Sequence, residues 1–560
     1  MIKYIFILLI GFLLPVTTGC TDTNLTHDIP LVPRPAHLVP GSGNYLFSDK
    51  TVFVVENEEQ AAVAASLISR FTNAAGFTPK LVVGATEKGD VRFVTDASLK
   101  SEAYSLEVSP EEIIVKASGD KGFFYALQTI RQLLPASIER ESLSDKKEKW
   151  SIPAMNVQDE PRFEYRALLL DASRFFIPKE NVLRIIDCMS MLKINKLHFH
   201  LTDDNGWRIE IKKYPRLTEV GAWRVDRMDV PFPARRNPKS GEPTPIGGFY
   251  SQKDIKEMVA YAAERQIMVV PEFDMPGHAT AVCRAYPEVS GGGEGRWKHF
   301  TFHPCKEETY RFISDVLDEI VALFPAPYIH IGGDEVHYGN QNWFTDPEIQ
   351  NFIKEKGLVN ETGLEHYFIR RAADLVAAKG KKMIGWDEIV DAGISPSKAL
   401  VMWWRHDRKY QLLKALEQGY QVVLTPRRPL YGDFVQDASH KVGRYWDGFN
   451  PLQDIYAFPE PISHLFKGYE DQILGMQFTL WTERIADGKR LDFMTFPRLI
   501  ALAESAWTSP KEKDWSRFCM RLPSFLEYLK EQGIYYFDVI HPQETPEPGG
   551  PEKADVLQNG

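Results

Sequence analysis

Residues 251–278, SQKDIKEMVAYAAERQIMVVPEFDMPGH, contain the pattern that decides the fold. Apolar residues recur at helical spacing over 251–265, and a short apolar run over 268–273 predicts a buried strand. Polar residues follow the strand at once, from Asp274 to His278. The stretch therefore predicts a helix, a strand and a polar loop at the carboxyl end of that strand, which is the repeating unit of an α/β fold.

The same unit recurs through the chain after Arg162. Eight strands are predicted, at 167–171, 196–201, 268–273, 328–332, 382–386, 399–403, 421–424 and 473–481. Helical stretches between them include 179–191, 251–265, 307–324 and 363–378. This predicts an α/β fold, a (β/α)8 TIM barrel. A doubly wound sheet is the alternative, but no Gly-x-Gly-x-x-Gly follows a strand.

The segment before the barrel has a different rhythm. It predicts strands at 51–56, 80–83, 91–95, 104–108 and 112–117, the last two as a hairpin, with helices at 59–72 and 121–134. We therefore expect a small N-terminal α+β domain over 20–160 (with a short leader after Cys20), the catalytic barrel over 161–541, and a Pro/Gly-rich tail over 542–560.

The composition of the 560 residues is that of a globular protein, with 44% hydrophobic and 25% charged residues. It excludes collagen-like, disordered and disulfide-scaffold chains. The formal charge is −10 with both signs mixed along the chain, so a nucleic-acid partner is not expected. Aromatic residues make up 12%, and five of the 12 Trp fall between Trp386 and Trp481. Such rings pack in cores or form apolar walls for ligands.

Residues 1–19 have the features of a secretory signal peptide. Lys3 precedes an apolar run over 4–16, and small residues lead to Cys20. Thr17–Cys20 resembles a lipobox, which predicts a lipid anchor on Cys20. Ordinary signal-peptidase cleavage is the alternative. We expect an exported lipoprotein, periplasmic or on the cell surface, that meets the membrane only through this anchor.

The remaining cysteines do not form a disulfide framework. Cys283 and Cys305 bracket a Gly-rich loop, so the two are candidates for a pair, whereas Cys188 is predicted to be a buried thiol. No Cys-x-x-Cys spacing indicates a metal site. We expect neither a metal nor a cofactor.

Polar and aromatic residues follow seven consecutive predicted strands, from the second to the eighth. Because the carboxyl ends of barrel strands meet on one face, these residues are expected to form the active site. They are His200, Asp203 and Asp204; Glu272, Asp274 and His278; His330, Asp334 and Glu335; Trp386, Asp387 and Glu388; Trp403, Trp404 and Arg405; Tyr431 and Asp433; and Trp481 and Glu483.

Carboxylates combined with aromatic rings are typical of glycoside hydrolysis, because sugars have apolar faces and hydroxyl rims. The sequence has no Gly-x-Ser-x-Gly, phosphate loop or His-Glu-x-x-His. Glu335 is the candidate general acid, and the charge of adjacent Asp334 is expected to raise its pKa. Neighbours at a strand end point in different directions, so Asp334 is not expected to be a nucleophile acting opposite Glu335.

Three motifs, in order, carry a family resemblance. They are LHFHLTDDNGWR (197–208), PEFDMPGH (271–278) and HIGGDEV (330–336), and the N-terminal GFFYALQTI (122–130) also fits. Over about residues 30–540 the chain resembles family 20 glycoside hydrolases, the exo-acting β-N-acetylhexosaminidases. The resemblance implies retention by substrate-assisted catalysis, in which the 2-acetamido oxygen of the substrate attacks the anomeric carbon and forms an oxazolinium ion.

The resemblance also implies residue roles. Glu335 would protonate the leaving oxygen and then activate water, Asp334 would orient the acetamido group, and Tyr431 would bind its carbonyl. Trp386, Trp404 and Trp481 would wall the pocket. Arg166, Asp203 and Glu483 would hold hydroxyls at its closed end, Asp433 would bind the 6-hydroxyl, and His278, with His200 and Asp274, would support the acid.

Two rival functions remain open from the sequence. One is a β-glycosidase with a carboxylate nucleophile, for which Glu388 and Glu483 are candidates. The other is a lipid-anchored glycan-binding protein on a degenerate barrel. The choice between GlcNAc and GalNAc, the oligomeric state and the pairing of Cys283 with Cys305 are not determined by the sequence.

Overall fold

The computed structural model describes residues 29–84, 88–144, 148–226, 238–445 and 447–549. The predicted signal peptide, 1–19, and the predicted lipidation site, Cys20, lie outside the described residues. No helix within the described ranges is long and apolar enough to cross a membrane.

The N-terminal domain is a seven-stranded mixed sheet with two helices, α1 (Glu58–Arg70) and α2 (Asp120–Leu133). In sheet order its strands are β1 (His37–Leu46), β7 (Ser151–Asp159), β5 (Tyr104–Val108), β6 (Ile113–Ala117), β4 (Val91–Thr95), β2 (Val52–Val55) and β3 (Lys80–Val83). Alternate residues of β5 and β6 are buried, and Phe93 of β4 stacks on Phe123 of α2 at 4.8 Å. The predicted hairpin is confirmed, since Tyr104 pairs antiparallel with Ala117.

The second domain is a closed eight-stranded parallel barrel, which confirms the predicted fold class. Its strands are β8 (Tyr165–Asp171), β9 (Lys196–His200), β14 (Met268–Glu272), β15 (Tyr328–His330), β16 (Lys382–Trp386), β17 (Ala399–Trp403), β18 (Val422–Leu424) and β19 (Ile473–Leu480). Each bound lies within two residues of its predicted position. The strands are recognisable in the sequence because most are buried on both sides.

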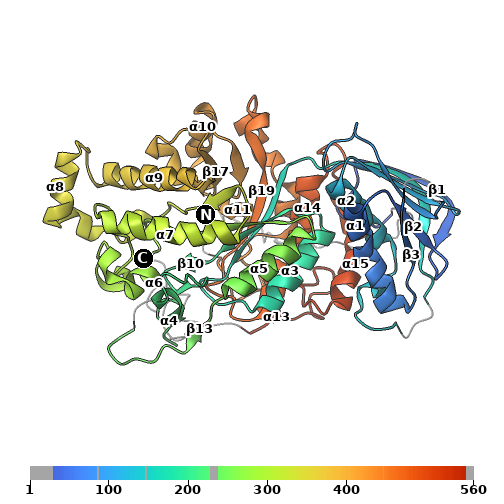
Figure 1. The fold of residues 1–560 in the computed structure, drawn as a ribbon, viewed down its shortest axis with the longest axis horizontal. Helices are drawn as coiled ribbons and strands as arrows, with labels where there is room; N and C mark the ends of the chain where they lie inside the picture. The colour runs from blue at the N-terminus through green and yellow to red at the C-terminus, as the bar shows by residue number, and fades with distance from the viewer. Residues whose placement is uncertain (1–28, 85–87, 145–147, 227–237, 446, 550–560) are drawn as a thin grey trace, which may run out of the picture.

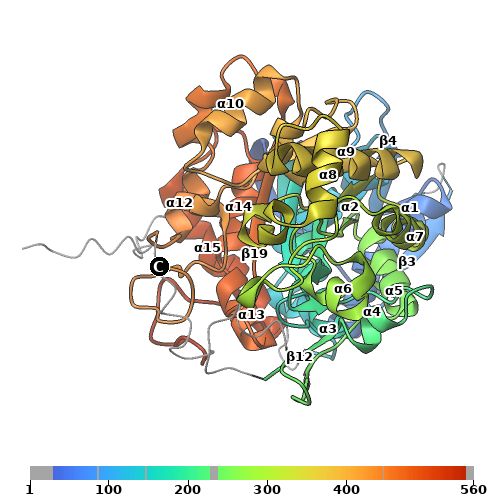
Figure 2. The same cartoon turned by 90° about the vertical axis from the view of Figure 1, so that its left-hand side faces the viewer.

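Helices surround the barrel (Figure 1). They include α3 (Lys179–Met191), α5 (Gln252–Ala263), α7 (Glu307–Leu323), α9 (Glu361–Ala378), α10 (Lys409–Glu417), α14 (Arg498–Trp507) and α15 (Trp515–Glu531). Between β16 and β17 the connection is only a 3-10 helix, η8 (Asp387–Ala392). Figure 2 looks at the opposite end of the molecule from the N-terminal sheet, where α6 (Thr280–Ala285) and α8 (Pro347–Glu355) lie in front.

The N-terminal domain covers the amino end of the barrel. Asp159 at the end of β7 pairs with Lys193 at 2.9 Å and accepts a hydrogen bond from Trp507 Nε1 at 2.9 Å. Glu102 pairs with Arg166 at the start of β8 at 2.8 Å. The carboxyl ends of the strands therefore face away from this domain, toward the left of Figure 1, and their loops are free to build a site.

Three cysteines of the barrel domain are not cross-linked. Cys188, Cys283 and Cys305 are buried free thiols. The suggested pairing of Cys283 with Cys305 is therefore wrong. Cys283 instead lies against the backbone carbonyl of Thr301, at 3.5 Å from Sγ to oxygen.

Candidate active site

The acidic pair Asp334 and Glu335 lies in the turn after β15. Gly332 and Gly333 enter this turn with φ of 70° and 93°, and Glu335 itself has φ 54°. A Cβ atom on Gly332 would lie 1.7 Å from Oδ1 of Asp274, so only glycine lets the chain pass so close to that carboxyl. The turn leaves the Asp334 side chain 14% exposed and that of Glu335 31% exposed.

His278, in the loop after β14, lies between two sets of carboxylates. Its Nδ1 is 3.3 Å from Asp203 and 3.2 Å from Asp204, and its Nε2 is 3.6 Å from Asp334 and 3.4 Å from Glu335. Burial alone would lower the pKa of His278, but the charges of Asp203 and Asp334 raise it well above 6.5. His278 is therefore a buried cation that bridges the acidic pair to the rest of the site.

The pKa values of the acidic pair are the reverse of the expectation from sequence. Burial, together with the charge of Glu335, raises the pKa of Asp334 to about 7. The charge of His278 acts in the opposite direction. Burial also acts to raise the pKa of Glu335, but the hydrogen bond and charge of His278, with Arg444 and Arg174, bring it below 4.5. The expected rise for Glu335 is wrong for the free protein, because nearby cations outweigh its neighbour in the sequence.

Asp203 occupies the short hairpin of β10 (Thr202–Asp203) and β11 (Gly206–Trp207) after β9. Arg174 Nη2 lies 2.6 Å from its Oδ2, and His200 Nε2 lies 3.0 Å away. Burial would raise the pKa of Asp203, but Arg174 and His278 hold it well below 3.8. Arg174 also lies over the ring of Trp481, 4.7 Å from its centroid.

Arg166, which was predicted to bind substrate, lies at the other end of the barrel. It is at the start of β8, 1% exposed, and it pairs with Glu102 and donates to the carbonyls of Phe163 and Lys193. The assignment of Arg166 to the pocket is therefore wrong. The arginine at the carboxyl end of this strand is Arg174, and its position just after the predicted strand 167–171 was the overlooked signal.

A second arginine completes this side of the site. Arg444 Nε lies 2.6 Å from Asp433, and its Nη2 lies 2.6 Å from Glu483. Burial and the charge of Glu483 raise the pKa of Asp433 to about 6 despite Arg444. Arg444 and Arg174 bring the pKa of Glu483 below 4.5, although burial acts against them. Arg444 follows no strand, and nothing in the sequence pattern distinguished it.

Four aromatic side chains form one buried apolar cluster at the carboxyl ends of β16 to β19. The ring centroids of Trp386 and Trp481 are 5.9 Å apart, those of Tyr431 and Trp481 6.1 Å, and those of Trp404 and Tyr431 6.5 Å. Burial raises the pKa of Tyr431 well above 10, so its hydroxyl keeps its proton and is available as a donor.

Trp403 and Trp404 separate at the end of β17. Trp403 is buried in the main core, and Trp404 joins the aromatic cluster with its Nε1 donating to Glu388 at 3.0 Å. Burial and the charge of Asp387 raise the pKa of Glu388 well above 4.5 even though Arg405 lies 3.2 Å away. Burial therefore favours the uncharged form of Glu388.

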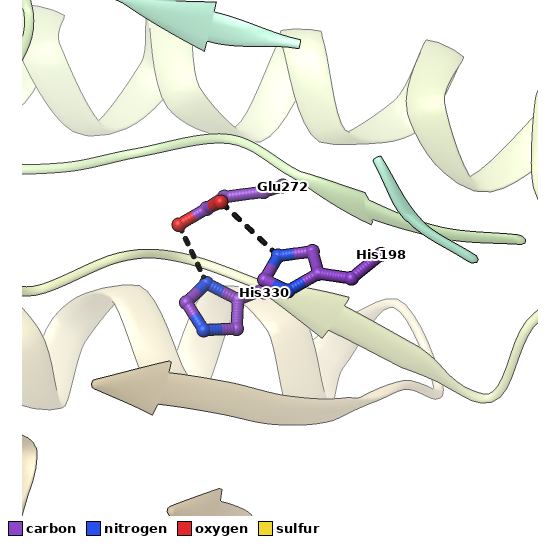
Figure 3. Close-up of side chains that lie close together, drawn as sticks. All are labelled: His198, Glu272 and His330. Carbon is purple, nitrogen blue, oxygen red and sulfur yellow. Dashed lines mark ion pairs between the residues drawn. The ribbon is translucent and has the colours of Figure 1, made fainter. Parts of the chain in front are cut away.

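Beneath these residues, three side chains from adjacent strands meet inside the barrel (Figure 3). His198 of β9 and His330 of β15 flank Glu272 of β14, with nitrogen–oxygen distances of 3.1 and 2.8 Å. One ring nitrogen from each histidine and one carboxylate oxygen of Glu272 lie within 4.8 Å of one another, a spacing that three ligands of a metal ion would also have. His200 also pairs with Glu272, and these imidazoles hold its pKa well below 4.5 although burial acts to raise it. The histidines compensate the buried charge of Glu272, and the cluster lies directly beneath the residues of the site.

The arrangement as a whole is a cluster of charged side chains beside a cluster of aromatic ones. One side holds the acidic pair and His278, and the other holds the two arginines with their carboxylates. Several acceptors in it are buried without a hydrogen-bond partner among the described residues, including Oδ1 of Asp334 and Oε2 of Glu483. Such groups are suited to accept hydrogen bonds from a polar ligand, and a sugar carries hydroxyl and amide donors.

Comparison with known families identifies both domains. Residues 163–510 match the model of the glycosyl hydrolase family 20 catalytic domain, and residues 28–160 match domain 2 of the same family. A beta-hexosaminidase of Porphyromonas gingivalis is 34% identical over 533 residues, 93% of this chain and 65% of that protein. A beta-N-acetylhexosaminidase of Cellulomonas fimi is 30% identical over 90% of this chain and 95% of its own length.

Solved structures agree with these relatives. The exo beta-N-acetylglucosaminidase of Vibrio harveyi, solved in complex with N-acetylglucosamine, superposes with a TM-score of 0.82. It is 32% identical, and the match covers 93% of this chain and 80% of that one. The sequence motifs, the fold and both domain matches indicate the same family. The chain therefore belongs to glycosyl hydrolase family 20 and is a glycoside hydrolase of the β-hexosaminidase type.

Proposed function

We propose that this enzyme is a retaining exo-β-N-acetylhexosaminidase. It removes terminal, non-reducing N-acetyl-β-D-hexosamine residues, GlcNAc or GalNAc, from glycans. The substrate supplies its own nucleophile, the oxygen of the 2-acetamido group. The names of the Vibrio harveyi and Cellulomonas fimi proteins, which refer to N-acetylated sugars, support this substrate class.

The observation that carries the proposal is the state of Asp334. Its Oδ1 is buried and accepts no hydrogen bond from any described residue. It lies next to Glu335 in the chain and beside the same His278. An unsatisfied buried acceptor next to an acid is suited to the N–H of an acetamido group, because that N–H becomes positively charged only as the oxazolinium forms.

Substrate binding also explains how Glu335 obtains its proton. In the free protein burial raises the pKa of Asp334 to about 7 and that of Glu335 is below 4.5, so Asp334 is the member of the pair that takes up a proton first as the pH falls. A hydrogen bond from the acetamido N–H stabilises ionised Asp334, and the negative charge of Asp334 then raises the pKa of Glu335. Binding of the correct substrate thus raises the pKa of Glu335, the residue next to the leaving oxygen, so that it can act as the acid.

The reaction then follows in two steps. In the first, Glu335 protonates the leaving oxygen, the anomeric C–O bond breaks, and the acetamido oxygen bonds to the anomeric carbon. Tyr431 donates a hydrogen bond to that oxygen, and Asp334 stabilises the charge on nitrogen. In the second, Glu335 removes a proton from water, the water oxygen bonds to the anomeric carbon, and the acetamido group is restored. Two displacements retain the β configuration.

The far side of the pocket accounts for removal of terminal residues. Arg174 with Asp203 and Arg444 with Glu483 and Asp433 form ion pairs at 2.6 Å, which present charged donors and acceptors to sugar hydroxyls. Trp386, Trp404 and Trp481 supply the apolar wall. A pocket closed by these pairs accepts a chain end, so cleavage proceeds from the non-reducing terminus.

The proposal is tested with aryl β-glycosides of GlcNAc, GalNAc and glucose, with proton NMR of the first product. We expect the acetamido sugars to be cleaved and the β anomer to appear first, with glucoside hydrolysis slower by orders of magnitude. Equal rates on glucoside and N-acetylglucosaminide, or a first product of α configuration, would contradict it.

We also propose that the mature protein is exported and anchored through a lipid on Cys20. The support is the sequence alone: the apolar run over 4–16 and the lipobox-like Thr17–Cys20. Cys20→Ala should move the protein from the membrane fraction to the soluble fraction of the cell. Unchanged fractionation of that variant would contradict the anchor.

A further inference from the structure

The long connection between β18 and β19 carries Arg444 into the site. Its Nε lies 2.6 Å from Oδ2 of Asp433, and its Nη2 lies 2.6 Å from Oε1 of Glu483. The N–H of Arg444 donates to the carbonyl of Asp433 at 2.8 Å, and the N–H of Val435 donates to the carbonyl of Arg444 at 2.9 Å. The connection thus folds back on itself, and the position of the guanidinium depends on the path of the residues just before it, 441–443.

Close packing holds this path on one side. Gly443 has φ of 150°, a conformation that favours glycine, and a Cβ atom on it would lie 2.7 Å from Cγ1 of Val435. The carbonyl of Val442 accepts a hydrogen bond from Arg490 of α13 (Gly488–Thr495). Arg490 is fully buried, so this donor is fixed in the core of the barrel domain.

The N–H groups of the same stretch are held by Glu547, from a segment that follows α15. Its Oε2 accepts a hydrogen bond from the N–H of Lys441 at 2.8 Å, and its Oε1 accepts one from the N–H of Val442 at 2.9 Å. Arg490 Nη2 lies 3.0 Å from Oε1 of Glu547, and Arg490 Nη1 donates to the carbonyl of Pro548 at 2.9 Å. Hydrogen bonds to an ionised carboxylate are shorter and stronger than those between neutral groups.

The segment that carries Glu547 is itself attached to the barrel domain. The hydroxyl of Tyr535 donates to the carbonyl of Pro546 at 2.8 Å. Residues 541–544 are exposed, whereas the side chain of Glu547 is only 17% exposed. The segment therefore turns inward at Glu547, toward the connection that carries Arg444.

We propose that Glu547 is a positioning residue for substrate binding that acts through Arg444. By fixing the backbone that leads to Arg444, it places the guanidinium between Asp433 and Glu483. The inference rests on the proposed function, in which these ion pairs hold sugar hydroxyls at the closed end of the pocket. The carboxylate of Glu547 is itself occupied by two backbone N–H groups and Arg490, so it acts on the sugar only through the arginine that it positions.

Tyr431 lies in the same connection but is held by other contacts. It forms a β-bridge to Thr479, and Asn450 Nδ2 donates to its carbonyl at 2.9 Å. Loss of the Glu547 contacts should therefore displace Arg444 and leave Tyr431 in place. Contacts that bind substrate and transition state equally affect KM and not kcat. The expected effect is a rise in KM with kcat nearly unchanged.

The experiment is a double-mutant cycle on the aryl β-glycoside of GlcNAc. For Glu547→Ala we expect KM to rise by about five- to tenfold, with kcat within about twofold of the wild type. Arg444→Ala should raise KM further, and the double variant should match Arg444→Ala, because Glu547 acts only through Arg444. Glu547→Gln keeps one acceptor for the backbone N–H groups and should show a smaller rise. If the alanine variant does not fold, Glu547→Gln carries the test.

Glu544→Ala is the matched control, since Glu544 is an exposed carboxylate of the same segment. It should leave KM and kcat unchanged. An unchanged KM in the Glu547 variants, a fall in kcat alone, or effects of Glu547→Ala and Arg444→Ala that multiply in the double variant would overturn the proposal. Absence of hydrolysis of both GlcNAc and GalNAc aryl glycosides by the wild type would instead refute the proposed function, so the two failures are distinguishable.

Discussion

His278 Nε2 lies 3.4 Å from Oε2 of Glu335, and both residues have left-handed backbone conformations, with φ of 52° and 54°. A non-glycine residue in this region costs about 1–3 kcal/mol. Two such residues face each other here, so local strain accompanies the contact between the acid and its cation. His278 stabilises the ionised form of Glu335 in the free protein. This interaction must weaken when substrate binds, so that Glu335 can carry a proton.

Removing the acid itself gives the first prediction. Glu335→Gln should lower kcat on natural glycans by about 10²–10⁴-fold, because an amide cannot protonate the leaving oxygen. The loss should be smaller for aryl glycosides with acidic phenols, which need little proton transfer. Steady-state kinetics over a series of phenols measures this dependence. Near-normal hydrolysis of oligosaccharides by the variant would remove Glu335 from the role.

Asp334→Asn tests the partner of the acid. The charge that Asp334 stabilises on the acetamido nitrogen exists mainly in the transition state, so kcat should fall by at least about a hundredfold with KM changed little. Turnover and binding of a GlcNAc product, measured by calorimetry, separate the two effects. A variant that lost affinity and kept kcat would contradict the assignment.

The raised pKa of Asp334 also predicts a pH dependence of stability. Its pKa is about 7 in the folded protein against 3.8 for an ordinary aspartate, so between these values the folded state binds more protons than the unfolded chain. The free energy of unfolding therefore falls as pH rises through this interval. Asn does not titrate, and Asp334→Asn should show a smaller fall between about pH 5 and pH 7.5. Chemical denaturation at both pH values measures the difference, and parallel curves would contradict the raised pKa.

Arg174 and Arg166 form a matched pair, because one lies at each end of β8. Arg174→Lys should raise KM and leave the melting temperature close to that of the wild type, since the planar group whose Nη2 lies 2.6 Å from Asp203 is lost while the charge remains. Arg166→Ala should leave KM unchanged and destabilise the fold by about 3–5 kcal/mol, because it removes the ion pair of buried Arg166 with Glu102 and the hydrogen bonds to the carbonyls of Phe163 and Lys193. The reverse pattern, with KM raised only in the Arg166 variant, would restore Arg166 to the pocket.

Glu388 tests the rival mechanism with a nucleophilic carboxylate. Its pKa is raised well above 4.5 by burial and by Asp387, so a neutral glutamine resembles the form of the side chain that burial favours. Glu388→Gln should retain turnover within about threefold, whereas loss of a nucleophile costs several orders of magnitude. Burst kinetics with an aryl substrate would reveal a covalent intermediate if the rival were correct.

The fold was predictable because each barrel strand is a short apolar run followed by polar residues, as in Met268–Glu272. Strands β1 and β7 of the N-terminal sheet were missed; most residues of β1 are exposed, and no apolar alternation marks it. Asp334, Glu335 and His278 could be placed in one site because parallel strands bring their carboxyl ends together. Cys283 and Cys305 could not be judged, since pairing depends on the path of the loop between them.

The pKa values of the site and the paths of its long loops could not be predicted from the sequence. The pKa of Glu335 depends on His278, Arg444 and Arg174, which come from three different loops. Because Asp334 is adjacent to Glu335 in the chain, the sequence indicated only the effect of Asp334 on the pKa of Glu335. Arg444 reaches Glu483 from the long connection between β18 and β19, and no spacing rule connects those two positions. Arg166 was assigned from the family resemblance although it lies at the start of its strand, whereas Arg174 follows the carboxyl end of β8.

The central claim is that the acetamido oxygen of the substrate is the nucleophile, and one substrate series tests it directly. Aryl β-glucosaminides are compared in which the N-acetyl group carries no, one, two or three fluorine atoms. Fluorine withdraws electrons from the carbonyl, so log kcat/KM should fall steeply and linearly with substitution, by at least about a hundredfold over the series. Rates that stay within about threefold across the four substrates would show that the protein supplies the nucleophile and would contradict the account.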